Sequence, residues 1–113
     1  MSEDIKIYHP KDLTLKEILP GAKMWAIGME NSMLTYFDIA PDSDFPEHSH
    51  ESEQITLVLD GELCFSYGGK TVTLKKGDAV AIPSNVPHRA VTAEKPCRAV
   101  DAWSPIRKDY LQK

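Results

Sequence analysis

Two of the chain's four histidines, His48 and His50, stand one residue apart in the stretch FPEHSHESEQ. Residues two apart in a β-strand point to the same face, with Cα atoms roughly 6.5–7 Å apart. Their imidazoles can therefore bind the same metal ion, each at about 2.1 Å. A histidine on a strand is more often a surface residue or a hydrogen-bonded one, so the pair indicates a metal site only if further ligands come from elsewhere in the chain.

Gln54 and His88 can supply those ligands. Gln54 follows the short turn ESE and begins the strand expected to pair with the one that carries the histidines. His88 follows PSNVP, a turn that ends one predicted strand and starts another. Because strand residues alternate between two faces, Gln54 shares the face of Thr56, whereas Glu53 points the other way. Gln54 and His88 are therefore candidates for the third and fourth ligands.

Short strands separated by turns have to position these residues. From Lys23 onward, apolar and aromatic runs alternate with turn signals, which is typical of an antiparallel barrel or sandwich. Asp60-Gly61 and Gly68-Gly69 predict hairpins that join QITLVL to ELCFSY and ELCFSY to KTVTL. We expect one all-β domain over residues 1–113, with an N-terminal arm (1–22), a β-barrel (23–104) and a C-terminal tail (105–113).

Composition limits the partners and the location. The net charge is −4, and no stretch of lysine and arginine is dense enough for a phosphate-binding face. No segment approaches the roughly 20 apolar residues that a membrane span needs. The first residues, MSEDIKIYHP, begin acidic and contain no apolar run, unlike a secretory signal. We expect a cytoplasmic protein that binds neither nucleic acid nor membrane, with Cys64 and Cys97 as free thiols.

The histidine motifs resemble those of the cupin superfamily. The first cupin motif is His-x-His, a ligating acid or amide, and then Gly, and it matches HSHESEQITLVLDG through His48, His50, Gln54 and Gly61. The second motif combines Gly, Pro, Asn or Gly, and His at fixed spacing, and it matches GDAVAIPSNVPH, which ends at His88. The resemblance implies a small double-stranded β-helix, or jelly roll, with a metal held at these histidines and at position 54.

One ligand departs from the common cupin pattern, because many cupins carry a glutamate where this chain has Gln54. An amide oxygen and three imidazoles add no charge, so a divalent ion would keep its full charge and act as a stronger Lewis acid. The same ligand set should bind metal more weakly than one with a carboxylate. We expect one divalent transition metal ion, and zinc, nickel, iron and manganese all suit these ligands.

The final predicted strand, CRAVDAWS, places Asp101 and Trp103 on one face, and Arg107 follows in the tail. A carboxylate in an apolar strand is costly to bury without a partner. Asp101 therefore either points outward toward a lysine or lines the metal site. An inward Asp101 would supply an acid or base and Trp103 an aromatic wall, while Arg107 could bind a carboxylate through two hydrogen bonds.

Three segments, HSHESEQITLVLDGE, KKGDAVAIPSNVPH and DAWSPIRKDYL, resemble the small cupins of pectin and uronate degradation. The similarity covers roughly residues 23–111. Those proteins convert 4,5-unsaturated monouronates, from pectin or alginate, into linear 5-keto-4-deoxyuronate. The resemblance implies that Arg107 binds the carboxylate of a small acidic sugar, that Asp101 transfers a proton and that Trp103 packs on the sugar face.

Three other functions stay open at this point. Polyketide cyclases share the scaffold and the three-histidine, one-glutamine site, but their large apolar substrates would leave Arg107 without a partner. A dioxygenase would need a redox metal with open coordination positions. A non-enzymatic cupin that binds a sugar or another small molecule is the third alternative.

The oligomeric state is expected by analogy. Small cupins commonly dimerise, so we expect a homodimer that uses an edge strand and the N-terminal arm. Trp25, in the apolar stretch KMWAIG, would then anchor the interface; the alternative is that this side chain belongs to the core.

Overall fold

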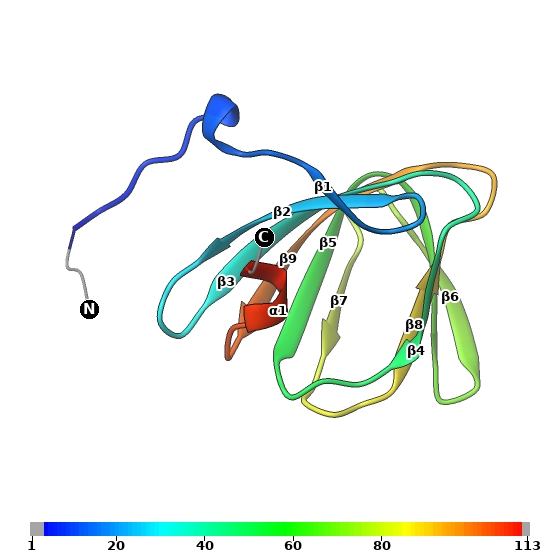
Figure 1. The fold of residues 1–113 in the computed structure, drawn as a ribbon. Coiled ribbons are helices and arrows are strands. Elements are labelled where there is room, and N and C mark those ends of the chain that lie inside the picture. Colours follow the sequence, from blue (N-terminus) through cyan, green and yellow to red (C-terminus); the bar gives the residue numbers. More distant parts are fainter. Residues whose placement is uncertain (1–3, 112–113) are drawn as a thin grey trace.

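The computed structural model describes residues 4–111, which form nine strands and two short helical turns (Figure 1). The elements are η1 (Pro10–Asp12), β1 (Lys16–Leu19), β2 (Ala22–Gly28), β3 (Met33–Ile39), β4 (Asp44–His48), β5 (Glu53–Tyr67), β6 (Lys70–Lys75), β7 (Ala79–Ile82), β8 (His88–Val91), β9 (Cys97–Ser104) and α1 (Lys108–Leu111). Among these residues no helix is long and apolar enough to cross a membrane.

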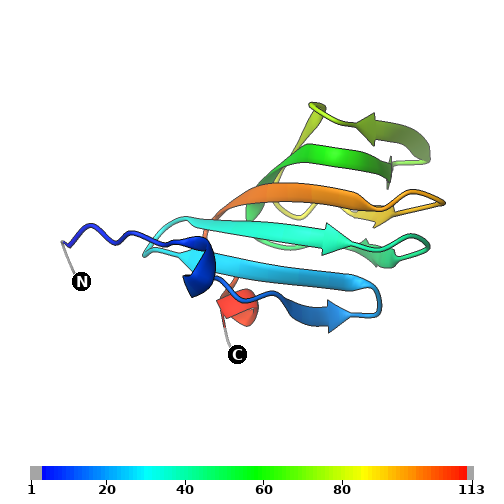
Figure 2. The same cartoon turned by 90° about the horizontal axis from the view of Figure 1, so that it is seen from above.

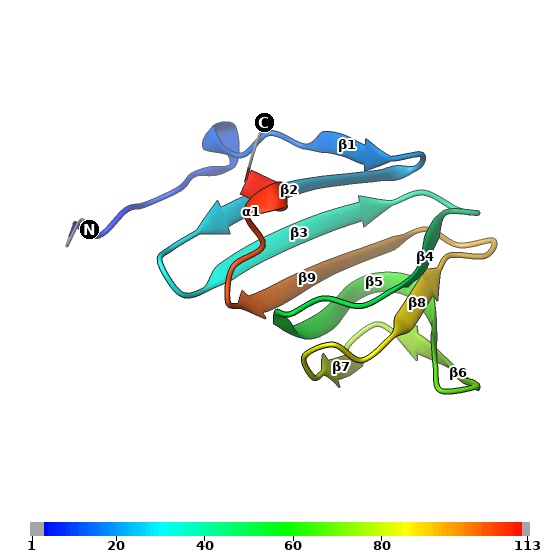
Figure 3. The same cartoon turned by 60° about the horizontal axis from the view of Figure 1, so that its bottom comes forward.

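The strands form two antiparallel layers that curl toward each other (Figure 3). One layer contains β1, β2, β3, β9, the first half of β5, and β7. The other contains β6, the second half of β5, β8 and β4. Because β5 belongs to both layers, it holds them in one curled sheet that leaves a hollow between them. This all-β arrangement confirms the predicted jelly roll.

The hairpin predicted at Asp60-Gly61 is wrong, because β5 runs without a break from Glu53 to Tyr67. The register shifts between Val58 and Asp60, so a β-bulge bends the strand from one layer into the other. Gly61 has φ +81°, and a Cβ there would lie 1.8 Å from the carbonyl oxygen of Pro96. This glycine therefore permits a close approach between two strands. The hairpin predicted at Gly68-Gly69 is confirmed, since Tyr67 pairs directly with Lys70.

Strand β1 lies inside the segment that we expected to be an arm. Lys16 pairs with Met24 of β2, so the sheet begins before residue 23. Residues 4–15 precede that strand, and they extend beyond the end of the sheet as an arm (Figure 2). The name N-terminal arm is used below for residues 4–15 alone.

The core fills the closed end of the hollow. Its buried side chains come from both layers: Met24, Phe37, Ile39, Val58, Leu63, Phe65, Leu74, Ile82, Cys97 and Ala99. The C-terminal tail turns back, and α1 packs against β2 (Figure 3). Leu111 lies so close to Gly28 that a Cβ on this glycine would come within 2.7 Å of it. The tail thereby brings Tyr110 against the core, where its ring contacts Phe37 and Trp103.

Candidate metal centre

Three histidines meet at the mouth of the hollow. His48 ends β4, His50 follows in the loop, and His88 begins β8. His48 and His88 are direct cross-strand partners, which sets their rings 4.5 Å apart between centroids. One nitrogen from each of the three residues lies within 4.8 Å of the others, a grouping that could hold a metal ion. We expected both histidines of the pair on one strand, yet only His48 lies in β4.

Backbone carbonyls fix the tautomer of all three rings. Each Nδ1 lies within hydrogen-bonding distance of a carbonyl oxygen two residues away: His48 to Pro46 at 2.7 Å, His50 to Ser52 at 2.9 Å and His88 to Val86 at 2.8 Å. A carbonyl oxygen only accepts, so each Nδ1 carries a hydrogen and each neutral Nε2 presents a lone pair. Burial lowers the pKa of His50 and of His88, which favours this neutral form.

Gln54 supplies the observation that tests whether a cation fits. Its Nε2 donates to Thr56 Oγ1 at 2.9 Å and to Asp101 Oδ1 at 3.3 Å. Its Oε1 therefore faces His50, where it lies 3.0 Å from Nε2. Gln54 Oε1 and the lone pair of His50 Nε2 are both hydrogen-bond acceptors, so two acceptors face each other without a hydrogen between them. A cation bound by both would remove their repulsion, and the three histidines with Gln54 therefore fit a metal ion.

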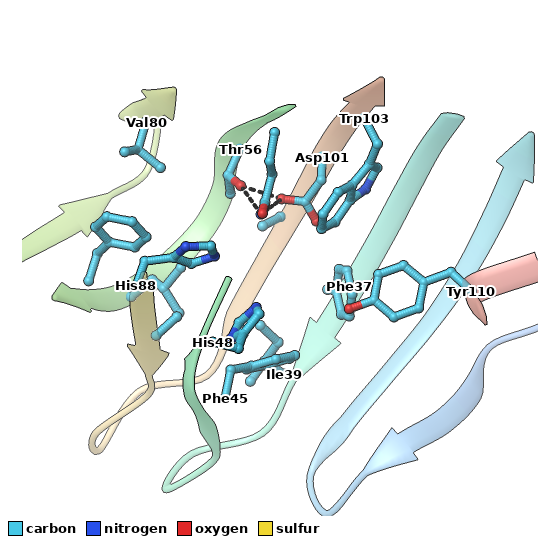
Figure 4. Close-up of a pocket in the computed structure, with 15 residues that line it drawn as sticks. Phe37, Ile39, Phe45, His48, Thr56, Val80, His88, Asp101, Trp103 and Tyr110 are labelled. Atoms are coloured by element: carbon cyan, nitrogen blue, oxygen red, sulfur yellow. Dashed lines mark hydrogen bonds between the residues drawn. The ribbon is translucent and has the colours of Figure 1, made fainter. Parts of the chain in front are cut away.

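Asp101 points into the hollow and is buried, with 4% of its surface exposed. Thr56 donates a short hydrogen bond to its Oδ1 (Figure 4). Thr35 donates to its Oδ2 at 3.1 Å. Thr35 in turn accepts a hydrogen bond from Trp103 Nε1 at 2.8 Å. Burial raises the pKa of Asp101 to about 6, against the lowering effect of these donors. The alternative of an outward Asp101 paired with a lysine does not occur.

The hollow contains a cavity of about 60 Å³ that reaches from these polar residues to the core (Figure 4). Its polar wall is formed by His48, Gln54, Thr56, His88 and Asp101. The rest of the wall is apolar, and it comes from Phe37, Ile39, Phe45, Leu63, Phe65, Val80, Ala90, Ala99, Trp103 and Tyr110. The cavity is therefore small and polar only where His48, His88, Gln54, Thr56 and Asp101 line it, whereas His50 does not line it.

Arg107 lies beside the cavity and does not line it. Its guanidinium stacks on Tyr110 at 4.1 Å and on Trp103 at 5.2 Å, both of which do line it. Nη1 donates to the Tyr110 hydroxyl at 3.1 Å, while Nη2 and Nε donate to Asp109 at 2.8 and 3.4 Å. One fork of the guanidinium is thus held by Asp109, and each Nη keeps one further N–H.

Tyr110 and Ser52 are site residues that the sequence reasoning did not identify. Tyr110 stands in the tail motif DYL, and an aromatic residue shortly after the last strand was its only signal. The buried Ser52 accepts from His50 through its carbonyl, and its hydroxyl donates to the carbonyl of Pro105 at 2.6 Å. Ser52 therefore joins the histidine loop to the tail that carries Arg107.

Comparison with known proteins gives relatives of several activities. Acireductone dioxygenase of Tuber melanosporum is 33% identical over 79 residues, 59% of this chain and 46% of that protein. The enzyme of the same name from Leishmania major is 29% identical over 98 residues, 66% of this chain and 28% of that protein. The chain thus matches less than half the length of these curated relatives.

Solved structures resemble the chain over nearly its whole length. KdgF from Halomonas sp. superposes with a TM-score of 0.85 at 24% identity, over 92% of this chain and 98% of that one. The polyketide cyclase RemF from Streptomyces resistomycificus has a TM-score of 0.77 at 28% identity, over 92% of this chain and 82% of that one. Residues 35–103, more than half of the chain, match the family model of the cupin domain. The chain therefore belongs to the cupin family.

Proposed function

We propose that this cupin is a metal-dependent enzyme that opens the ring of a 4,5-unsaturated monouronate to give linear 5-keto-4-deoxyuronate. The observation that carries the proposal is the amide of Gln54, which links a buried carboxylate, Asp101, to the nitrogen of His50 that faces the metal position. The sequence motifs shared with uronate cupins and the full-length similarity to KdgF support the same substrate class.

Three imidazole Nε2 atoms and Gln54 Oε1 would hold the ion in this proposal. A divalent transition metal bound there would supply Lewis-acid polarisation of a substrate oxygen. The chain itself contributes orientation, because the carbonyls of Pro46, Ser52 and Val86 fix the three rings. Gln54 is fixed in the same way by its two donated hydrogen bonds, which keep the amide oxygen turned toward His50.

Asp101 is the residue that we assign to proton transfer. Its raised pKa of about 6 leaves a proton available near neutral pH, and its deprotonated form can take one back. Addition of a proton to C4 and of water to C5 of the enol ether, with loss of one proton from the added water, gives a hemiketal. Loss of the hemiketal hydroxyl proton, with cleavage of the bond between C5 and the ring oxygen and protonation of that oxygen, gives the 5-keto product, and the aldehyde hydrate left at C1 loses water. Asp101 can serve these transfers, because each of the two steps takes up one proton and gives up one.

Arg107 and Trp103 would bind the substrate. The N–H groups left on Nη1 and Nη2 form a second fork, which matches a carboxylate. The ring of Trp103 would form the wall against the sugar, because its N–H is already donated to Thr35. A cavity of about 60 Å³ cannot enclose a polyketide of several rings, and a single sugar ring would have to lie partly in its open mouth.

A dioxygenase is the second candidate, and the 33% identity to acireductone dioxygenase favours it. A non-enzymatic cupin that binds a small molecule is the third. Metal analysis of the purified protein, a spectrophotometric assay for loss of the 4,5 double bond and an oxygen electrode separate the three. The proposal expects loss of the double bond without oxygen uptake. Oxygen uptake with an enediol substrate would instead identify a dioxygenase, and neither signal would identify a binding protein.

A further inference from the structure

A second cavity lies beside the C-terminal tail and takes no part in the proposed ring opening. It has a volume of about 230 Å³, against about 60 Å³ for the cavity at the metal centre. Its wall comes from the N-terminal arm, β1, β2 and α1, and contains Asp12, Leu13, Thr14, Lys16, Met24, Trp25, Ala26, Tyr110 and Leu111. Of the described residues that line either cavity, Tyr110 alone lines both.

The two cavities approach each other where β2 pairs with β3. Met24 lines the second cavity, Phe37 lines the first, and the two residues are direct cross-strand partners. The Cα atoms of such partners lie only about 4.5–5.5 Å apart in an antiparallel pair. The side chain of Tyr110 reaches from α1 toward Phe37, on the side of the first cavity away from His88 (Figure 4). Its ring therefore stands where the two cavities come close together.

Neighbouring side chains hold the ring of Tyr110 in this position. Its ring centroid lies 6.0 Å from that of Phe37 and 5.5 Å from that of Trp103, both in edge-to-face contact. The guanidinium of Arg107 lies 4.1 Å from the ring centroid, and its Nη1 donates to the hydroxyl at 3.1 Å. Leu111, the next residue, lies directly against Gly28 of β2. Contacts to the ring, to its hydroxyl and to the neighbouring residue together fix Tyr110 between the two cavities.

We propose that Tyr110 sets the size of the molecule that the site admits, because its ring separates the cavity at the metal centre from the second cavity. Removal of a large packed side chain leaves space that the surrounding structure fills only in part, so the two cavities would join without this ring. The second cavity offers apolar side chains, among them Leu13, Met24 and Trp25. The joined space would therefore take a flat carboxylate of several fused rings, whereas the native site takes a small acid.

This inference rests on the proposed function in one respect, the carboxylate that Arg107 binds, and its test measures binding without turnover. Isothermal titration calorimetry of the metal-loaded full-length protein would compare benzoate with anthracene-9-carboxylate, which carries the same acid group on three fused rings. In Tyr110→Ala the affinity for anthracene-9-carboxylate, relative to that for benzoate, should rise at least about tenfold over wild type, because more apolar surface leaves water. The use of a ratio cancels any effect of the lost contact between Tyr110 and Arg107 on the acid group.

Two control variants should leave this ratio at the wild-type value. Tyr110→Phe keeps the ring and removes only the hydroxyl, so the cavities stay separate. Tyr67→Ala removes a tyrosine that is 42% exposed and lines neither cavity. Because Tyr110 packs against the core, Tyr110→Leu provides a second test variant if Tyr110→Ala does not fold. Circular dichroism and metal content should match wild type in each variant that is compared.

Each outcome decides the proposal. A folded Tyr110→Ala or Tyr110→Leu protein that binds anthracene-9-carboxylate no tighter than wild type would overturn it, because the ring then separates no space that a ligand can enter. A gain of the same size in Tyr110→Phe or Tyr67→Ala would also contradict it, since neither change removes the ring between the cavities. Absence of ring opening by the wild-type protein would count against the proposed activity alone and would leave the binding result unchanged.

Discussion

Gln54 and Asp101 are joined by a hydrogen bond of 3.3 Å, in which the amide nitrogen donates to the carboxylate. The amide oxygen of the same side chain lies 3.0 Å from His50 Nε2. One side chain thus contacts both the proposed metal position and the proposed proton donor. Because an amide accepts at one end and donates at the other, whereas a carboxylate only accepts, glutamine at this position serves a purpose that glutamate does not.

Replacement of Gln54 with Glu should separate metal affinity from activity. The carboxylate adds a charged ligand, so zinc affinity should rise by about tenfold or more. The same carboxylate cannot donate to Thr56 or Asp101 and places a second negative charge beside Asp101, so kcat should fall by at least about tenfold. Metal competition with a chromophoric chelator and steady-state kinetics measure the two effects. Equal kcat values for wild type and Gln54→Glu would show that activity does not require an amide at this position.

Asp101→Asn should alter the pH dependence of stability in the metal-free protein. The pKa of Asp101 is about 6 when folded against a reference of 3.8, so the folded state keeps a proton that the unfolded state has lost between these values. Stability from this group therefore falls as pH rises from about 4 to about 6, by roughly 3 kcal/mol in total. Asparagine does not titrate, so the variant does not lose this stability. Between pH 4 and pH 7, the unfolding free energy of the variant, measured with urea, should therefore rise by about that amount relative to wild type.

The variant must be compared with wild type because other groups change the stability with pH in the opposite direction. His50 and His88 have lowered pKa values, so their contribution is present above the unfolded pKa and is lost as pH falls. Subtraction of the variant from wild type cancels that contribution. A difference in unfolding free energy that stays constant between pH 4 and pH 7 would contradict a raised pKa for Asp101.

Ser52→Ala should loosen the tail that carries Arg107. The serine hydroxyl donates to the carbonyl of Pro105 at 2.6 Å, and its loss should cost about 1 kcal/mol of unfolding free energy. The KM for the uronate should rise more than kcat falls, because the tail holds the binding residue. Ser66→Ala is a suitable control, since the hydroxyl of the half-buried Ser66 bonds Thr71 across a hairpin. Identical KM values in both variants would show that the tail is fixed by other contacts.

Arg107→Lys should weaken substrate binding. Lysine has no second planar fork for a carboxylate once Asp109 is bound, so the KM for the unsaturated uronate should rise by about tenfold. Arg89→Lys provides a matched control, because Arg89 also makes a bidentate bond, to Asp44, on the exposed surface. A KM that changes no more in the first variant than in the second would exclude Arg107 from carboxylate binding.

Much of the fold follows from local sequence signals. Alternating apolar runs and the Gly68-Gly69 turn indicated antiparallel strands, and the resemblance to the two cupin motifs grouped His48 and His50 with a distant His88. The hairpin prediction at Asp60-Gly61 was wrong because the same residue types occur in tight turns and in β-bulges. Only the packing of Gly61 against Pro96 distinguishes them, and that contact joins segments far apart in the chain.

Long-range contacts also explain what the sequence could not predict at the site. The direction of Asp101 was ambiguous because its donors, Thr35 and Thr56, come from two other strands. Tyr110 acquires a position only through the reversal of the tail, which places it beside Phe37 and Trp103.

The most direct test of the proposed ring opening is a time course of a 4,5-unsaturated monouronate by proton NMR with metal-loaded protein. We expect that the vinyl proton signal disappears, that signals of linear 5-keto-4-deoxyuronate replace it, and that Asp101→Asn with the same metal content is inactive. Wild-type protein that carries stoichiometric metal and leaves the vinyl signal at the uncatalysed rate would contradict the proposed function.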